Sequence, residues 1–330
     1  MRSLLILLLL DAPIVRSREQ SEEAAWRTIS VYVGREAARQ ARKGSHSTPE
    51  SFMDADKPGK WHSQGSQDQI IAALFPKMRH SRGNGGYFVD LAANHPLFIS
   101  NTRALERDYG WNGLCIDAAE HLVADLARRR TCTVVNAVLS TQQDDVVTFR
   151  AWLTSGWQTG LSGIVGTSGE NRADGGGGVG SVLARYWTSL LTRFWKPQSV
   201  PTEDRKRVAT TFGAILDHFH APRVIDYLSL DVEGAEMMVL SGFPFGRYSF
   251  RAMTLERPSR DLQTLLMAHN YSYVRHLDMT PGSDLDQLWL HESMLHRRDA
   301  VLQRACAKSR CIRERLPPSA GPKRQKQEAR

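Results

Sequence analysis

Residues 87–117 read YFVDLAANHPLFISNTRALERDYGWNGLCID. The stretch holds two short apolar runs separated by a segment of helical character, and an acid stands at or near the end of each run, Asp90 and Asp117. A strand, a helix and a second strand of these lengths form one βαβ unit, whose two strands lie parallel. Because parallel strands end at the same edge of a sheet, we expect the two carboxylates to lie close together there.

A third acid stands in an equivalent position much later in the chain. The apolar strand expected at residues 226–230 ends in Asp231, and Val232, Glu233 and Gly234 follow it. Taken singly, Asp90 or Asp117 could equally cap a turn. Three acids at equivalent strand ends favour a ligand site instead, since ligands of open parallel sheets bind outside the carboxyl ends of the strands.

Strands and helices alternate from residue 86 onward, which predicts an α/β fold with a mostly parallel, doubly wound sheet and an antiparallel closing strand. Ser100 is expected to cap a helix at 101–109, and Gly110 to end it. The later elements are expected, in chain order, as helix 118–130, strands 134–138 and 146–152, helix 202–219, strand 226–230, helix 235–240, strand 251–256, helix 261–269, and strands 271–276 and 287–291.

The net charge of +8 is concentrated at the two ends of the chain. Residues 308–330 carry +6 and residues 1–48 carry +3, which leaves −1 for the body of the protein. Tails of this composition are usually solvated, so we do not expect nucleic-acid binding, although the tail is a candidate for contact with an anionic membrane surface. With 41% hydrophobic and 24% charged residues, the chain as a whole has an ordinary globular composition.

The amino terminus resembles a targeting segment. A charged start is followed by the apolar run Leu4–Leu10, which is too short to span a bilayer. We therefore expect a signal peptide or organelle-targeting leader within residues 1–20, followed by an extension over 21–62, and a location in the secretory and endomembrane system or an organelle. A buried terminal strand or helix is the alternative interpretation.

The four cysteines do not form a metal-binding pattern, and we assign no metal ligand. Cys115 lies in an apolar strand and Cys132 precedes another, so we expect both to be small buried hydrophobic residues rather than partners. Cys306 and Cys311 are close enough to form a bridge in a secreted protein.

Residues 154–201 interrupt the alternation of strands and helices. Gly175–Gly178 form a run of four glycines, but no Lys-Ser or Lys-Thr follows them as in a phosphate loop. We interpret the segment as a flexible insertion. The aromatic stretch with Trp187 and Trp195 would be a flap over the site or a surface for a partner or membrane.

The loop after the first strand indicates which ligand the acids bind. Dinucleotide-binding proteins have Gly-x-Gly-x-x-Gly there, whereas residues 92–96 are Ala-Ala-Asn-His-Pro, and the proline removes an amide donor. The sequence therefore favours a cofactor without phosphates, and S-adenosylmethionine has two cationic groups and a ribose. Asp90 can attract its ammonium and Asp117 can accept its ribose hydroxyls. Asn136 is well placed beside the adenine, or is simply a turn residue.

Several ordered segments resemble the FkbM-type methyltransferases over residues 63–291. The segments are Ser63–Asp68, Phe88–Asn94, Ser100–Thr102 with Leu105 and Glu106, Trp111–Asp117, Val135–Val138 and Leu228–Gly234. The chain differs from the family where Ala92–Pro96 replaces the usual Gly-Ala-Asn-Asp-Gly, and where Asp117 replaces the usual Glu.

The resemblance implies a Rossmann-like class I methyltransferase domain over 63–295, followed by a basic tail over 296–330. It implies methyl transfer from S-adenosylmethionine, commonly to a hydroxyl oxygen. We expect a small-molecule, glycan or lipid acceptor, and a protein would also be compatible with the sequence. The alternative is a noncatalytic S-adenosylmethionine-binding or interaction protein on the same fold. The cofactor-binding residues would be Asp90, Ala92, Asn94, Asp117, Asn136 and Asp231.

Methyl transfer to a hydroxyl requires alignment of the two reactants and a base that takes the hydroxyl proton. Asp231 and Glu233 lie where the acceptor should enter, and His95 and Glu256 are the other candidates for this base. Glu233 could instead be a first-turn helix acid favoured by the helix dipole. A divalent cation bridging Asp231 and Glu233 would also suit the two carboxylates.

Overall fold

The computed structural model describes residues 30–32, 56–76, 78, 85–153, 162–167, 202–277 and 286–298. Several parts of the sequence lie outside the described residues. They are the predicted leader, the run of four glycines, Trp187, Trp195, Cys306, Cys311 and most of the basic tail. Within the described ranges, no helix combines the length and apolarity needed to cross a membrane.

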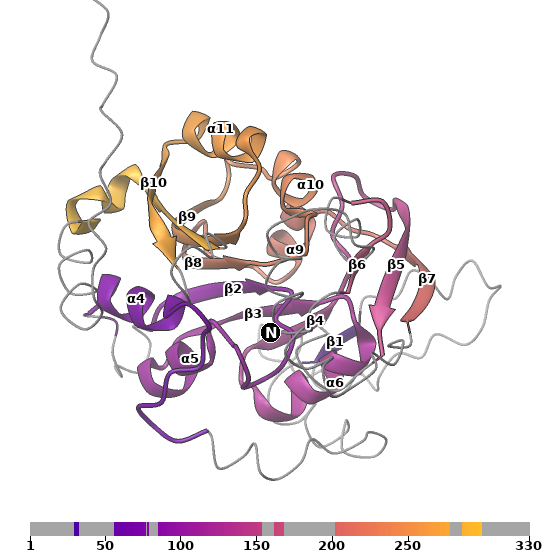
Figure 1. Ribbon diagram of the computed structural model, residues 1–330, viewed down its shortest axis with the longest axis horizontal. Helices are drawn as coiled ribbons and strands as arrows, with labels where there is room; N and C mark the ends of the chain where they lie inside the picture. The colour runs from indigo at the N-terminus through magenta and orange to yellow at the C-terminus, as the bar shows by residue number, and fades with distance from the viewer. Residues whose placement is uncertain are drawn as a thin grey trace, which may run out of the picture.

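An eight-stranded sheet forms the centre of the molecule, in the order β1-β4-β3-β2-β8-β9-β11-β10 (Figure 1). Strands β2, β3, β4, β8 and β9 are parallel neighbours, whereas β11 runs antiparallel between β9 and β10. The predicted α/β sheet with an antiparallel closing strand is confirmed. The strands are β1 Ser30–Tyr32, β2 Tyr87–Leu91, β3 Asn112–Asp117, β4 Thr133–Asn136, β8 Val224–Leu230, β9 Ser249–Glu256, β10 Tyr271–Leu277 and β11 Asp286–His291.

Helices cover both faces of this sheet, because side chains alternate between two apolar faces along each strand. Phe88 packs into the core under one set of helices, and its neighbour Val89 packs into the core under the other. The first set is α4 Gln67–Leu74, α5 Arg103–Tyr109 and α6 Glu120–Arg129, with the 3₁₀ helix η4 Glu292–Arg297. The second set is α9 Phe212–His218, α10 Glu236–Ser241 and α11 Arg260–Ala268.

The strand order reverses at β2, which lies between β3 and β8. Such a switch point opens a crevice at the carboxyl ends of the strands. The register brings the predicted residues to this edge, since Asp90 lies opposite Ser229 on β8 and Asp117 lies opposite Asn136 on β4.

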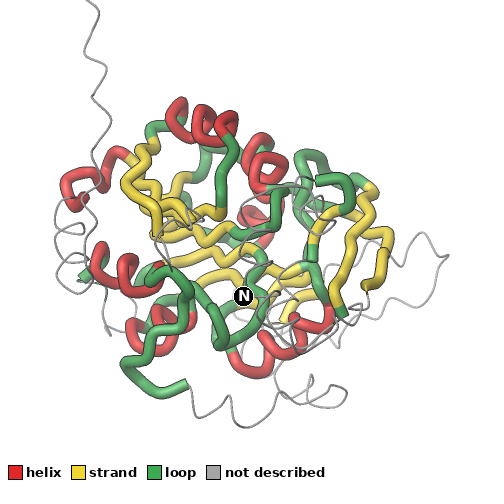
Figure 2. Tube along the Cα trace, in the orientation of Figure 1, coloured by secondary structure: helices red, strands yellow, loops and turns green. Residues whose placement is uncertain are grey.

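Residues 202–208 were expected to be helical, and this prediction is wrong. They form strand β7 Thr202–Val208, which pairs along its whole length with β5 Val146–Trp152. With β6 Gly163–Ile164 these strands form a separate three-stranded sheet beside the main one (Figure 2). Cross-strand pairing supplies the physical reason, including an ion pair between Arg150 and Asp204 at 2.7 Å.

Two local predictions for α5 meet different outcomes. Gly110 ends the helix in a left-handed conformation with φ 68°, as expected. The helix begins at Arg103 rather than at residue 101, and its N-cap is Thr102, whose side chain makes no capping hydrogen bond. The Ser100 hydroxyl accepts hydrogen bonds from the amides of Thr102 and Arg103 at 3.4 and 3.1 Å. Ser100 thus holds the turn that precedes the first helical residue.

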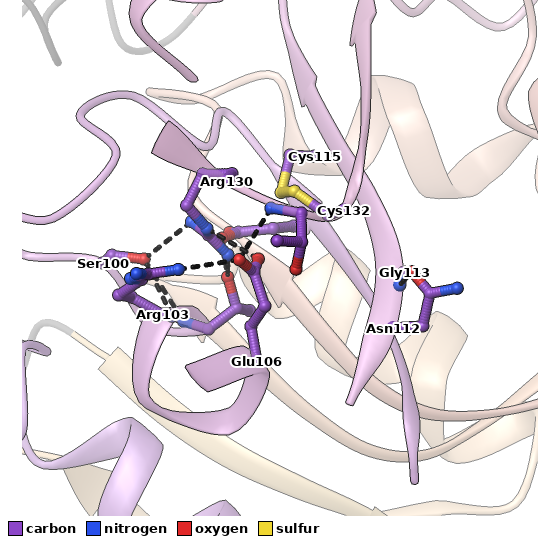
Figure 3. The surroundings of a disulfide bond; sticks show 11 residues. Ser100, Arg103, Glu106, Asn112, Gly113, Cys115, Arg130 and Cys132 are labelled. Carbon is purple, nitrogen blue, oxygen red and sulfur yellow. Dashed lines mark hydrogen bonds and ion pairs between the residues drawn. A yellow bond between two sulfur atoms is a disulfide. The ribbon is translucent and has the colours of Figure 1, made fainter. Parts of the chain in front are cut away.

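Cys115 and Cys132 form a disulfide, with their Cα atoms 6.2 Å apart (Figure 3). The prediction that they are buried hydrophobic residues rather than partners is therefore wrong, although both are buried. Cys115 lies on β3, and Cys132 immediately precedes the neighbouring parallel strand β4. Pairing of these two strands brings the sulfurs together across 17 residues of sequence.

Candidate cofactor and acceptor site

Asp117 ends β3 and is held by two backbone amides. Its Oδ2 accepts a hydrogen bond from the amide of Asn94, and its Oδ1 accepts one from the amide of Ala119, both at 2.8 Å. A carboxylate oxygen has two lone pairs, so each oxygen keeps one for a ligand hydroxyl. The carboxylate is therefore fixed in orientation and retains acceptor capacity.

Burial is the main cause that raises the pKa of Asp117 to about 6, and the nearby charge of Asp90 acts in the same direction. The two amides and Arg207 act in the opposite direction. Only 6% of this residue is exposed, so its charge is weakly solvated. Ligand groups that donate hydrogen bonds would therefore favour the ionised form.

Asp90 lies deeper in the sheet, on the face covered by α5 and α6. Its Oδ2 accepts a hydrogen bond from the Thr102 hydroxyl at 2.5 Å, and that hydroxyl accepts one from Arg130 Nη2 at 2.7 Å. Burial raises the pKa of Asp90, while Arg130 lowers it and Asp231 raises it. A cationic ligand group beside Asp90 would stabilise its ionised form.

Arg130 is the centre of a buried network of hydrogen bonds (Figure 3). Its Nε donates to Glu106 Oε2 at 2.8 Å, and its Nη1 donates to the Ser100 hydroxyl at 3.1 Å. Burial alone would raise the pKa of Glu106, but Arg130, the amide of Thr131 and Arg103 together hold that pKa below its usual range. The sequence singled out Glu106 only through the family resemblance, and Arg130 was missed.

The loop after β2 turns sharply through left-handed conformations. Ala92 has φ 59° and Asn94 has φ 49°, values that residues with a Cβ atom adopt at a cost. The turn brings the Asn94 amide to Asp117 and so joins the ends of β2 and β3. Ala92 stands where the family usually has glycine, and its positive φ gives a physical reason for that glycine.

Asn136 ends β4 and contacts a residue that the sequence did not indicate. Its Nδ2 donates to the carbonyl oxygens of Asp117 and Ala118 at 2.9 and 3.1 Å. Its Oδ1 accepts from Arg207 Nη2 at 2.8 Å. Arg207 was missed because it lies on β7, which was expected to be helical, so no sequence signal pointed it toward this edge.

Three of the four candidates for the base lie together. Carboxylate oxygens of Asp231, Glu233 and Glu256 all lie within 4.8 Å of one another. Asp231 follows β8, and its amide meets the Leu91 carbonyl oxygen at 3.5 Å. Glu256 ends β9 and is buried, whereas Asp231 is exposed.

The structure places His95 elsewhere. Its Nδ1 accepts hydrogen bonds from the amides of Leu97 and Phe98 at 3.1 and 2.8 Å, which commits this nitrogen to its own turn. Burial lowers the pKa of His95, and its charged neighbours are Asp125 and Arg129 on α6. His95 therefore belongs to the α6 side of the edge, not to the cluster of acids.

The fold and this edge define an α/β protein consistent with a Rossmann-like methyltransferase. The family model described as the methyltransferase FkbM domain matches residues 90–273, more than half of the chain. The chain belongs to this family, as the resemblance predicted, and the membership supports a methyltransferase activity. No curated protein and no solved structure matched the chain.

Proposed function

We propose that this protein transfers a methyl group from S-adenosylmethionine to a hydroxyl oxygen. The observation that carries the proposal is the pair of buried acids, Asp90 and Asp117, at the ends of neighbouring parallel strands that lack a phosphate loop. A site lined with carboxylates suits a ligand with an ammonium, a sulfonium and two ribose hydroxyls, and would repel phosphates.

The residues fit this cofactor in three places. Asp117 retains one lone pair on each oxygen for the ribose hydroxyls. Asp90 is a buried carboxylate whose raised pKa a neighbouring ammonium would lower. Asn136, Ala92 and Asn94 lie at the same edge and would complete the cofactor contacts, and Asp231 adjoins the loop at Leu91.

Held by Asp90 and Asp117, S-adenosylmethionine would supply an electrophilic methyl carbon, and its sulfur would keep the electron pair of the bond that the acceptor oxygen replaces. The chain's own contribution is to orient the acceptor and to remove its proton. Asp231 is exposed just beyond the carboxyl end of β8, and one of its oxygens lies within 4.8 Å of oxygens of the other two acids. We assign Asp231 the role of the base, whose carboxylate takes the proton from the acceptor hydroxyl.

Calorimetry with S-adenosylmethionine and with its demethylated product tests cofactor binding. We expect both to bind, and Asp117→Asn and Asp90→Asn to weaken binding. The control is Asp144→Asn, which removes the same charge from an exposed residue with φ 65°, a conformation that asparagine tolerates. Failure of the wild-type protein to bind either compound would overturn the proposal.

Transfer of a labelled methyl group tests catalysis. We place the acceptor among hydroxyl-bearing small molecules, glycans and lipids, and a panel of these is assayed with wild-type protein and Asp231→Asn. Full turnover by folded Asp231→Asn would remove the proposed role of this residue. Cofactor binding without transfer to any acceptor class would favour a noncatalytic binding protein.

We also propose a location in the secretory and endomembrane system. The Cys115–Cys132 disulfide supports it, because such bonds persist in oxidising compartments and are rare in reducing ones. Fractionation of cells that express the full chain tests the location. Recovery only in the cytosol would contradict it.

A further inference from the structure

The cluster of Asp231, Glu233 and Glu256 combines carboxylates from two parallel strand ends and the turn between β8 and α10. Their oxygens lie within 4.8 Å of one another. Two oxygens on opposite sides of a cation are separated by twice the metal–oxygen distance, which is about 4.2 Å for Mg²⁺ and about 5 Å for Ca²⁺. The spacing of the oxygens in this cluster is therefore similar to the spacing of ligands around one hard cation. Like charges at this separation repel each other unless a cation or protons compensate.

Glu256 provides a second, independent observation. The residue is only 9% exposed, and its Oε2 has no hydrogen-bond partner within the described part of the chain. Its Oε1 is taken by the guanidinium of Arg257. A buried carboxylate oxygen without a donor is costly, and a bound cation is a usual way to compensate it.

The charges of the three acids and Arg257 do not cancel one another. The three acids carry −3 when ionised and Arg257 carries +1, which leaves −2 among these four side chains. A divalent cation would neutralise that remainder. Oxygen ligands of this kind select hard cations such as Mg²⁺, Mn²⁺ and Ca²⁺ over soft ones.

A second group of candidate metal ligands lies equally close together, but its ligand atoms already have protein partners. Glu106, Cys115 and Cys132 also lie within 4.8 Å of one another. The two sulfurs are bonded to each other, and both oxygens of Glu106 accept hydrogen bonds from Arg103, Arg130 or the amide of Thr131. Glu256 Oε2, by contrast, has no hydrogen-bond donor within the described residues.

We propose that Asp231, Glu233 and Glu256 bind a hard divalent cation at the acceptor side of the crevice. The cation would lie beside the loop that follows β2, because the Asp231 amide meets the Leu91 carbonyl oxygen. It would also lie near the second sheet, since a Cβ atom on Gly163 would be 3.9 Å from Glu233 Cβ.

The role of this cation rests on the proposed function. An acceptor hydroxyl that coordinates the cation is oriented by it and loses its proton more readily. The proton passes to the Asp231 oxygen that does not bind the cation, and the acceptor oxygen then forms its bond to the methyl carbon. Methyl transfer would therefore require the cation, whereas cofactor binding at Asp90 and Asp117 would not.

Binding of Mn²⁺ to the full chain, measured by electron paramagnetic resonance without cofactor or acceptor, tests the site. We expect one saturable Mn²⁺ site that Mg²⁺ and Ca²⁺ compete for. Glu256→Gln and Asp231→Asn should each weaken Mn²⁺ binding about tenfold or more, because affinity at such sites follows the number of charged ligands. Asp144→Asn is the charge-matched control and should bind Mn²⁺ as the wild-type protein does.

Circular dichroism of each variant shows whether it is folded, and Glu233→Gln, on a partly exposed turn, provides a third test if Glu256→Gln does not fold. Absence of saturable Mn²⁺ binding to the wild-type protein overturns the proposal, as does unchanged Mn²⁺ binding in the folded cluster variants. Calorimetry with S-adenosylmethionine in chelator distinguishes this failure from failure of the proposed function. Cofactor binding without Mn²⁺ binding would overturn only the cation site.

Discussion

Arg207 on β7 donates a hydrogen bond from Nη2 to Asn136 Oδ1 at 2.8 Å, at the carboxyl end of β4. Its Nη1 donates to the carbonyl oxygen of Ala118 at 3.0 Å, immediately after Asp117. A strand of the second sheet therefore holds the ends of two strands of the main sheet. Because these ends carry the proposed ribose and adenine contacts, the second sheet contributes to the shape of the cofactor site.

Arg207→Met should weaken the binding of S-adenosylmethionine about tenfold. The variant loses the two hydrogen bonds that Arg207 donates to these strand ends, each worth about 1.5–3 kcal/mol where fully formed, and a tenfold change corresponds to about 1.4 kcal/mol. Calorimetry measures the affinity. Arg205→Met, on the same strand with a half-exposed side chain, is the control, and equal affinities for the two variants would contradict the role of Arg207.

Cofactor affinity should increase between pH 5 and pH 7. Burial raises the pKa of Asp117 from its ordinary value of 3.8 to about 6. The contribution of this group to stability is therefore fully present below pH 3.8 and is lost as pH rises through about 6, because the folded state favours the protonated form. The ribose hydroxyls bind the ionised carboxylate of Asp117. Cofactor affinity therefore rises with pH, whereas the contribution of Asp117 to stability falls.

Calorimetry in buffers from pH 5 to pH 8 measures this dependence. Asp117→Asn cannot ionise and should bind the cofactor weakly, with a flatter profile over the same range. A wild-type profile that stays flat through pH 6 would show that Asp117 does not bind the ribose in its ionised form.

The main sheet and its acids could be predicted because their signals are local. The apolar runs that end near Asp90, Asp117 and Asp231 are contiguous in sequence, and the alternation of strands and helices determines that parallel strands end at one edge. The positions at which these strands end could therefore be predicted from short stretches of residues. The closing strands β10 and β11 followed from the same kind of signal.

The features that could not be predicted depend on contacts between distant segments. Strand β7 has a charged sequence with no apolar alternation, and its conformation is determined by β5, which ends 50 residues earlier. The Cys115–Cys132 pair depends on the parallel pairing of β3 with β4. Arg130 meets Glu106 only after α5 and α6 have packed against the same face of the sheet.

Replacement of both Cys115 and Cys132 by alanine should lower the free energy of unfolding by about 3 kcal/mol, the value expected for a loop of this length. Urea unfolding of wild-type and variant protein, each with and without reductant, measures the loss. Reductant should shift the midpoint of the wild-type protein and leave that of the variant unchanged. Peptide mapping without reduction should recover the two cysteines linked, and their recovery as free thiols would contradict the disulfide.

Ala92→Gly should raise the free energy of unfolding by about 0.5–1 kcal/mol. Alanine at φ 59° carries a left-handed penalty of about 1–2 kcal/mol, which glycine relieves, and the greater flexibility of glycine in the unfolded chain offsets part of the gain. Urea unfolding measures the difference. Ala93→Gly in the same loop is the control and should destabilise the protein, so that destabilisation by both substitutions would argue against the left-handed turn.

Arg130→Met should lower the free energy of unfolding by about 3–5 kcal/mol, because it leaves the buried Glu106 carboxylate without its main counter-charge. Both side chains are almost completely buried, with exposed fractions of 0% for Arg130 and 1% for Glu106. The double variant Arg130→Met with Glu106→Gln should lose less than the sum of the two single variants, since glutamine is neutral and still accepts from the Thr131 amide. Urea unfolding of the four proteins gives the coupling free energy.

The exposed pair Arg150 and Asp204 provides the control cycle, with side-chain exposures of 31% and 42%. Its coupling should stay below about 1 kcal/mol, as for other solvated ion pairs. Cofactor affinity is a second readout, because Arg130 also donates to the Thr102 hydroxyl that binds Asp90. Arg130→Met should therefore weaken the binding of S-adenosylmethionine, while Arg150→Met should not. Equal coupling in the two cycles would mean that burial does not strengthen the Arg130–Glu106 interaction.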